Sequence, residues 1–152
     1  MTETDWYLFM HQLPPKPLYL RAKVLTLLSK TGAVPLKDSV HVIPVRDDSL
    51  PQLERVSAVA LSGGGDTHTF RATPVGRPSQ EDLVRAFQRA RDEDYRELRT
   101  RVRKWQTALA RAGTGRSARG PFRIRLGHAR RRLEQIDRIV AAAMGQPSIP
   151  EA

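Results

Sequence analysis

The chain has 152 residues, a formal net charge of +10 and no cysteine. This length suits one hydrophobic core with an appendage, and the absence of cysteine excludes disulfides and thiolate-based metal or redox sites. No run approaches the ~20 apolar residues that span a bilayer, and the acidic start, Met1–Asp5, lacks the basic region of a secretory signal. We therefore expect a soluble, cytoplasmic protein with no membrane partner.

The positive charge is concentrated in the second half of the chain. Residues 1–78 hold 9 Lys+Arg against 7 Asp+Glu, whereas residues 79–152 hold 17 against 9. Residues 96–132 alone contain 13 basic residues and one acid, and twelve of the thirteen are arginine. The planar guanidinium group suits bidentate binding of phosphate and other oxyanions. The segment therefore indicates an anionic partner, and the alternative is a solvated surface without a ligand.

The first part of the chain begins with a strand pattern and continues with a helix pattern. The short apolar and aromatic run at 6–13 indicates a buried strand. Apolar residues recur at helical spacing between Pro17 and Gly32, which indicates an amphipathic helix with a glycine stop. Residues 33–45 are rich in β-branched side chains interrupted by a turn, which predicts either a hairpin or a bulged strand.

A second helix and a last strand complete this part. Ser49 is expected to cap a helix that stops at Gly63, and residues 67–75 alternate between polar and apolar as a strand does. The order of these elements predicts an α+β domain over residues 5–77. Its expected architecture is a ferredoxin-like sheet with its helices on one face.

The remaining chain, residues 79–145, predicts a basic antiparallel helical hairpin of coiled-coil character. Ser79 and the acids that follow it are a helix start, and the helix is expected over 80–112. A glycine-rich basic loop is expected over 113–121, and a second helix over 122–144, with Pro121 opening it. The tail, 146–152, contains two prolines and is expected to be disordered.

The two predicted helices carry matching apolar seams at 3-4 spacing. The first seam, interrupted by Arg91, is Val84, Phe87, Tyr95, Leu98, Val102, Trp105, Leu109 and Ala112. The second seam is Phe122, Leu126, Ala129, Leu133, Ile136, Val140 and Ala143. Trp6, Phe70 and Trp105 are expected in the core.

No motif of catalysis, cofactor binding or metal binding is present. The run Gly63–Gly65 follows a helix and precedes a strand, which is the reverse of a phosphate-binding loop. The four histidines lack the spacing of a helical metal pair, although strand neighbours could converge in space. We therefore expect no enzyme activity, no cofactor and no metal. The histidines are His11, His41, His68 and His128.

Two stretches resemble the N-terminal domain of ChrB-type chromate-resistance proteins. The first is Leu13-Pro14, Arg21-x-Lys23-Val24, Leu28, Gly32-Ala33-Val34-x-Leu36-x-Asp38-Ser39-Val40 and Pro44. The second is Phe87-x2-Ala90-Arg91-Asp92-x-Asp94-Tyr95-x-Glu97-Leu98. The resemblance covers roughly residues 5–140. It implies a transcriptional regulator that responds to chromate, with a Cas2-like ferredoxin fold in its first part.

The same fold resemblance raises the alternative of a metal-dependent nuclease of the Cas2 type. Such nucleases place a metal-binding aspartate at the end of the first strand, and this chain has His11-Gln12-Leu13 there. Longer members of the ChrB family continue into a second domain, where sensing could reside. The nuclease is therefore disfavoured, and a cluster of acids at a symmetric dimer interface would be the feature that supports it.

We expect a DNA-binding regulatory protein whose hairpin contacts phosphates, and which could form a homodimer through an exposed sheet edge. The alternative is a chromate sensor or accessory protein in which arginine and histidine side chains bind the oxyanion. Both functions could occur together. The residues expected to bind DNA or another anion are Arg96, Arg99, Arg103, Arg116, Arg119, Arg123, Arg130, Arg131 and Arg132.

Overall fold

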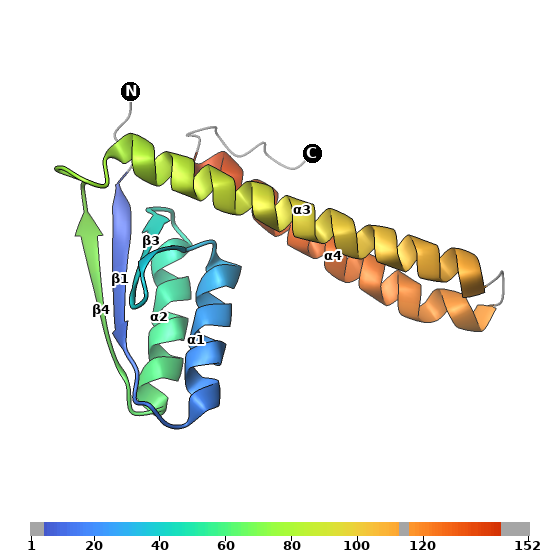
Figure 1. Cartoon of the computed structure of the whole chain (residues 1–152), viewed down its shortest axis with the longest axis horizontal. Helices are drawn as coiled ribbons and strands as arrows, with labels where there is room; N and C mark the ends of the chain where they lie inside the picture. Colours follow the sequence, from blue (N-terminus) through green and yellow to red (C-terminus); the bar gives the residue numbers. More distant parts are fainter. Residues whose placement is uncertain (1–4, 113–115, 144–152) are drawn as a thin grey trace. The chain divides into compact units, whose positions relative to one another are not determined.

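The structure is a computed structural model that describes residues 5–112 and 116–143 (Figure 1). The chain forms two compact units, and the boundary between them lies between Phe87 and Gln88. The division lies inside the first long helix, because the first two turns of that helix pack with the sheet.

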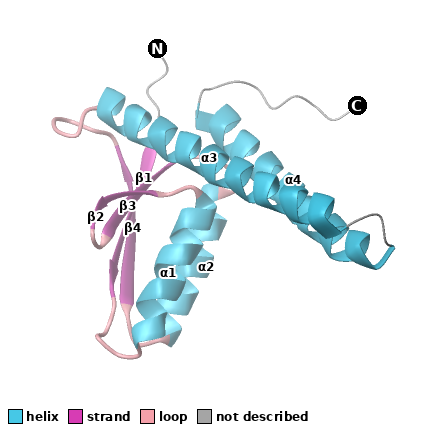
Figure 2. Ribbon diagram, turned by 45° about the vertical axis from the view of Figure 1, so that its right-hand side comes forward, coloured by secondary structure: helices cyan, strands magenta, loops and turns pink. Residues whose placement is uncertain are grey.

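The first unit contains a four-stranded antiparallel sheet with two helices on one of its faces (Figure 2). The strand order is β2-β3-β1-β4, which is the order of a ferredoxin-like fold. The predicted α+β class is confirmed, and residues 33–45 form a hairpin. The elements are β1 (Trp6–Gln12), α1 (Leu18–Thr31), β2 (Val34–Lys37), β3 (Val40–Pro44), α2 (Ser49–Ser62) and β4 (Asp66–Ala72).

The core lies between the sheet and its two helices. Phe9 of β1 and Ile43 of β3 have no exposed surface, and alternation along a strand places both on the helix-covered face. Apolar side chains of both helices complete the cluster: Leu20, Val24 and Leu28 from α1, and Leu53, Val56 and Ala60 from α2. Helix α1 ends as predicted at Gly32, whose φ of 89° is the left-handed conformation that glycine adopts without strain.

Three predicted details of this unit are wrong. Ser49 is buried and its hydroxyl donates a hydrogen bond to the Pro44 carbonyl oxygen at 2.8 Å, so it ties α2 to β3 and Asp48 takes the cap position. Strand β4 ends at Ala72, before the expected residue 75. Phe70 is 52% exposed because it lies directly opposite Leu8 on the sheet face away from α1 and α2.

The long helix α3 (Gln80–Ala112) begins in the first unit. The Asp82 backbone N–H donates to the Ser79 hydroxyl, and the Asp82 carboxylate accepts hydrogen bonds from the Ser79 backbone and hydroxyl, so the predicted cap is confirmed. Trp6 is 2% exposed, donates from Nε1 to the Gln80 Oε1 at 2.8 Å, and meets the ring of Phe87 edge to face. These contacts fix the start of α3 on β1.

The second unit contains the rest of α3 and the helix α4 (Arg116–Ala143), which form the predicted antiparallel pair. Helix α4 begins six residues before the predicted start, and Pro121 lies inside it. A proline this near a helix start removes a single backbone hydrogen bond, and residues 116–120 tolerate helical geometry. The remaining predicted loop residues, 113–115, and the predicted tail lie outside the described residues.

The seam of α4 departs from the prediction at two positions, whereas Phe122, Ala129, Ile136 and Val140 are buried or half-buried as predicted. Leu126 and Leu133 are 47% and 41% exposed, whereas Ile136 and Ile139 are buried. The buried and half-buried positions step through 129, 132, 136 and 139, so Arg132 occupies a seam position that the pattern had assigned to Leu133. The prediction failed because it chose the apolar residue of the two neighbouring positions.

The core of the first unit holds two histidines in contact. His11 of β1 and His41 of β3 are 4% and 5% exposed, and their ring centroids lie 5.4 Å apart. Burial and then the charge of Arg21 lower the pKa of His11, and burial and then His11 lower the pKa of His41 to about 4. The Nε2 atom of His11 and the Nδ1 atom of His41 are buried without a hydrogen-bond partner. Both rings are therefore neutral at pH 7.

We predict that acid destabilises the first unit through this pair. Both pKa values are depressed by folding from an ordinary value of 6.5, so the unfolded chain binds more protons as the pH falls. The stability is complete above pH 6.5 and declines as the pH falls toward 4. Urea unfolding at pH 7 and pH 5 should show a lower midpoint at pH 5. His41→Gln should reduce this difference, whereas His68→Gln on the exposed strand β4 should leave it; equal pH dependence in all three proteins would refute the assignment.

Candidate anion-binding surface on the helical hairpin

The acids of the hairpin lie near the start of α3 and in the later part of α4. No Asp or Glu occurs from Leu98 to Leu133, although arginine and lysine are frequent there. Exposed cations that share a segment with no carboxylate keep their charge and attract anions. The distal half of the hairpin is therefore the most electropositive part of the chain.

Three of the predicted arginines are compensated by acids. Arg96 pairs with Glu93, and Arg130 pairs with Glu134 at 3.2 Å. Both pairs are exposed, and the two residues of each pair lie about one helical turn apart on the same helix. Arg132 reaches across the hairpin to Asp94, with 3.4 Å between the Nη2 and Oδ1 atoms. These three positions contribute little net charge to the surface.

Four of the predicted arginines, Arg99, Arg103, Arg123 and Arg131, are exposed and form no ion pair with any described residue. The side chains of Arg116 and Arg119 lie outside the described residues. Between Leu98 and Leu133, three further cations are exposed and form no ion pair with a described residue, although they were not among the predicted binding residues. We call the set the distal cation set, and it consists of Arg99, Arg103, Lys104, Arg111, Arg123, Arg125 and Arg131.

A simple sequence signal could have found most of the distal cation set. Helical ion pairs form between residues three or four positions apart. Arg96 and Arg130 each have an acid at such a position, whereas Lys104, Arg111 and Arg125 have none. The signal fails where the partner lies on the other helix, as it does for Arg132.

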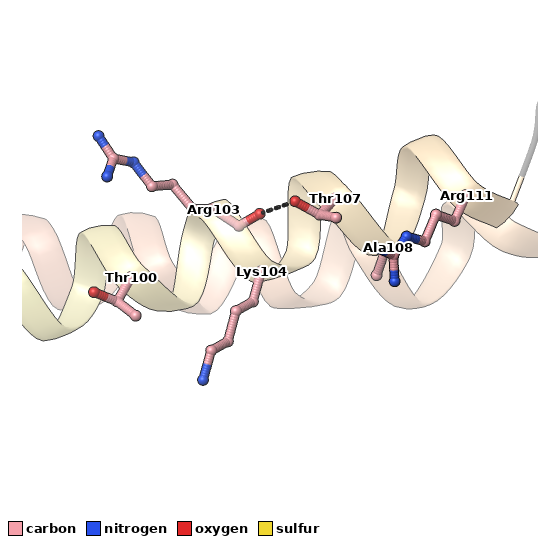
Figure 3. Close-up of a pocket in the computed structure, with 6 residues that line it drawn as sticks. All are labelled: Thr100, Arg103, Lys104, Thr107, Ala108 and Arg111. Atoms are coloured by element: carbon pink, nitrogen blue, oxygen red, sulfur yellow. Dashed lines mark hydrogen bonds between the residues drawn. The ribbon is translucent and has the colours of Figure 1, made fainter.

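Part of the distal cation set borders a shallow concavity on α3, with a volume of about 440 Å³. Its residues follow one face of the helix in steps of three and one. Figure 3 shows Arg103 and Lys104 extending away from the helix, and Thr107 donating its hydroxyl hydrogen to the Arg103 carbonyl oxygen at 3.0 Å. Because the threonine and alanine side chains are short, they leave room between the cations. The lining residues are Thr100, Arg103, Lys104, Thr107, Ala108 and Arg111.

A partly buried ionic cluster joins the two helices nearer the start of α3. Asp94 lies 3.1 Å from Arg91 within α3 and also accepts from Arg132 of α4. The Arg91 side chain is 5% exposed and that of Asp94 is 15% exposed. Tyr95 donates to Asp137 in the same region, and burial, followed by the bond to Asp137, raises the pKa of Tyr95 to about 12. One carboxylate therefore serves two arginines in the seam.

The sequence pattern recorded Arg91 only as an interruption of the apolar seam. The structure places Arg91, Asp94 and Tyr95, which all belong to the quoted ChrB-like motif, in this ionic cluster. The i, i+3 spacing of Arg91 and Asp94 was the available signal. These motif residues therefore join parts of the hairpin to each other, and the distal cation set follows the motif in the sequence, from Arg99 onward.

The described residues contain no group of three or more His, Asp or Glu side chains placed to hold a metal ion. Within the same residues, no helix has the length and apolarity to cross a membrane. The arrangement can therefore bind an anion through charge, and it displays no acidic metal centre in the part of the chain that is described.

We predict that Asp94→Ala destabilises the hairpin by about 3–5 kcal/mol, because it leaves Arg91 and Arg132 without their carboxylate. The matched control is Glu93→Ala, which removes an exposed pair with Arg96 and should cost less than about 1 kcal/mol. Urea titration followed by helical circular dichroism measures both. Equal effects of the two substitutions would show that the Asp94 cluster is not a structural element.

Comparison with known proteins identifies the family to which this chain belongs. The searches of curated proteins and of solved structures found no match. A protein family described as "Protein ChrB, N-terminal" matches residues 21–116, which is more than half of the chain and runs from α1 to the start of α4. The predicted resemblance is confirmed: the chain belongs to the ChrB N-terminal family of chromate-resistance-associated proteins.

Proposed function

We propose that this chain is a cytoplasmic regulator without enzyme activity, which binds DNA through the phosphates and does so in a chromate-responsive manner. The observation that carries the proposal is the distal cation set: seven exposed cations that form no ion pair with the described residues, on a segment without acids. Membership of the ChrB N-terminal family supports the connection with chromate.

Phosphate contact is the mode that these side chains favour. Arginine forks bind phosphate oxygens, and such contacts position a protein on DNA without reading its sequence. The concavity on α3 offers three cations with small residues between them, so a phosphate can approach without displacing a bulky side chain. Specific readout of bases would require further groups, and we assign none.

The test is a salt titration of DNA affinity. Binding that neutralises up to seven phosphates should give a slope of log K against log salt as steep as about −6. The variant Arg103→Gln/Lys104→Gln/Arg111→Gln should flatten the slope by roughly three units, about one for each lost contact. Fluorescence anisotropy with two duplexes of different sequence measures the slope and the sequence preference together.

The matched control removes the same charge from the other unit. Lys16, Lys23 and Lys37 are exposed on the first unit, and their replacement by Gln should leave the slope unchanged. A slope that the α3 variant does not alter, with helical content intact, would identify the hairpin cations as a solvated surface. Equal flattening by both variants would assign the effect to net charge alone. Titrations with chromate, and with sulfate as its isostere, test the response to chromate.

A second candidate function, direct oxyanion binding, is favoured by the histidine pair. His11 and His41 each bury a nitrogen without a partner, and Arg21 is close enough to lower the pKa of His11. Neutral imidazoles can donate N–H groups, and a nearby guanidinium favours an anion over a cation at this position. The pair is thus suited to a tetrahedral oxyanion, for which Arg21 would supply the charge-assisted hydrogen bond.

We predict that His41→Phe lowers the affinity for chromate by about tenfold, because it removes one charge-assisted donor from the site. Equilibrium dialysis with chromate, repeated in excess sulfate, measures the affinity. His68→Phe replaces an exposed histidine on β4 and should have no effect. Unchanged chromate binding in the His41 variant would exclude this site and leave the DNA-binding proposal unaffected.

A further inference from the structure

The two edges of the sheet differ in how they are protected. Edge strand β2 is four residues long, contains Pro35, and has a register irregularity between Pro35 and Lys37. Proline, lysine and bulges are the features that prevent an edge from pairing with another strand. Strand β4 is seven residues long and pairs with β1 in continuous register from Asp66 to Ala72. It contains no proline, lysine or bulge, so its outer backbone groups are free to pair.

The side chains of β4 are also accessible. None of its seven residues is buried, and Phe70 is 52% exposed on the face opposite α1 and α2. Leu8 of the neighbouring strand β1, directly opposite Phe70, is only half-buried. An accessible edge beside an apolar strip on the open face is the arrangement that β-sheet extension uses.

The charges of β4 favour a second copy of the same strand in antiparallel orientation. Asp66 lies at its start and Arg71 near its end, and both side chains are more than 60% exposed. Antiparallel pairing places the acidic end of each strand beside the basic end of the other, whereas parallel pairing would place like charges together. Arg71 already binds Asp5 of its own chain, and its exposed surface leaves room for a further acid.

We propose that two copies of this chain associate through β4, about a two-fold axis near Thr69, the central residue of the strand. The axis is normal to the sheet, so both Phe70 side chains lie on the face away from α1 and α2, close to the axis. Such an interface is isologous and closes on itself, and it joins two four-stranded sheets into one. The dimer carries two basic hairpins, and this inference does not depend on what the hairpins bind.

The experiment measures the mass of the full chain, freed of nucleic acid, by sedimentation equilibrium over a range of concentrations. The wild-type protein should be a dimer. Phe70→Lys should weaken association at least about tenfold, because it removes the aromatic contact and places like charges near the axis. Val75→Lys is the matched control: it makes the same change of charge at a fully exposed apolar residue just beyond β4, and it should leave the dimer intact.

A rescue experiment separates a lost interface from a damaged fold. Phe70→Glu alone should also weaken the dimer, whereas an equimolar mixture with Phe70→Lys should restore association through opposite charges. Overturning results are a monomeric wild type, a dimer that Phe70→Lys leaves unchanged, or two variants whose mixture fails to associate while each remains folded by circular dichroism.

Discussion

The carboxylate of Asp94 is the interaction on which the hairpin depends. Two helices that carry so many arginines repel each other unless some of the charge is compensated where they meet. Asp94 provides that compensation for Arg91 on its own helix and for Arg132 on the other. The distal cations, by contrast, lie on the surface of a segment that contains no acid after Glu97 and before Glu134. Arginine thus serves two purposes in the hairpin. Arg91 and Arg132 contact Asp94 between the helices, and the distal arginines form the candidate binding surface.

The fold was largely predictable because its strands and helices have clear periodicity. The helix over 80–112, its Ser79 cap and the Gly32 stop follow from local chemistry, and each was found. The strand order followed only from the expected ferredoxin-like architecture, since periodicity does not determine contacts between residues far apart in the chain. Two positions of the α4 seam, Leu126 and Leu133, were predicted wrongly for a related reason. Leu133 is the better apolar candidate, but the partner of Arg132 lies 38 residues away on α3.

The candidate surface was predicted in outline, and its composition came from the structure. The count of basic residues located the electropositive segment, residues 96–132, because the number of charged side chains can be read directly from the sequence. Which cations are unpaired depends on neighbours at three or four positions and on the opposing helix, so Lys104, Arg111 and Arg125 were missed. The histidine pair was missed because His11 and His41 come from different strands, whose adjacency the spacing rule for helices does not address.

The placement of these groups gives the two units different sensitivities to their surroundings. From Leu98 to Leu133 the positive charge comes almost entirely from arginine, which keeps its charge at any physiological pH. Dissolved ions do screen that charge, because it is exposed. His11 and His41 behave in the opposite way: they are buried from ions, yet they respond to protons. We therefore expect a change of pH to act mainly on the first unit, and a change of ionic strength to act mainly on the distal hairpin.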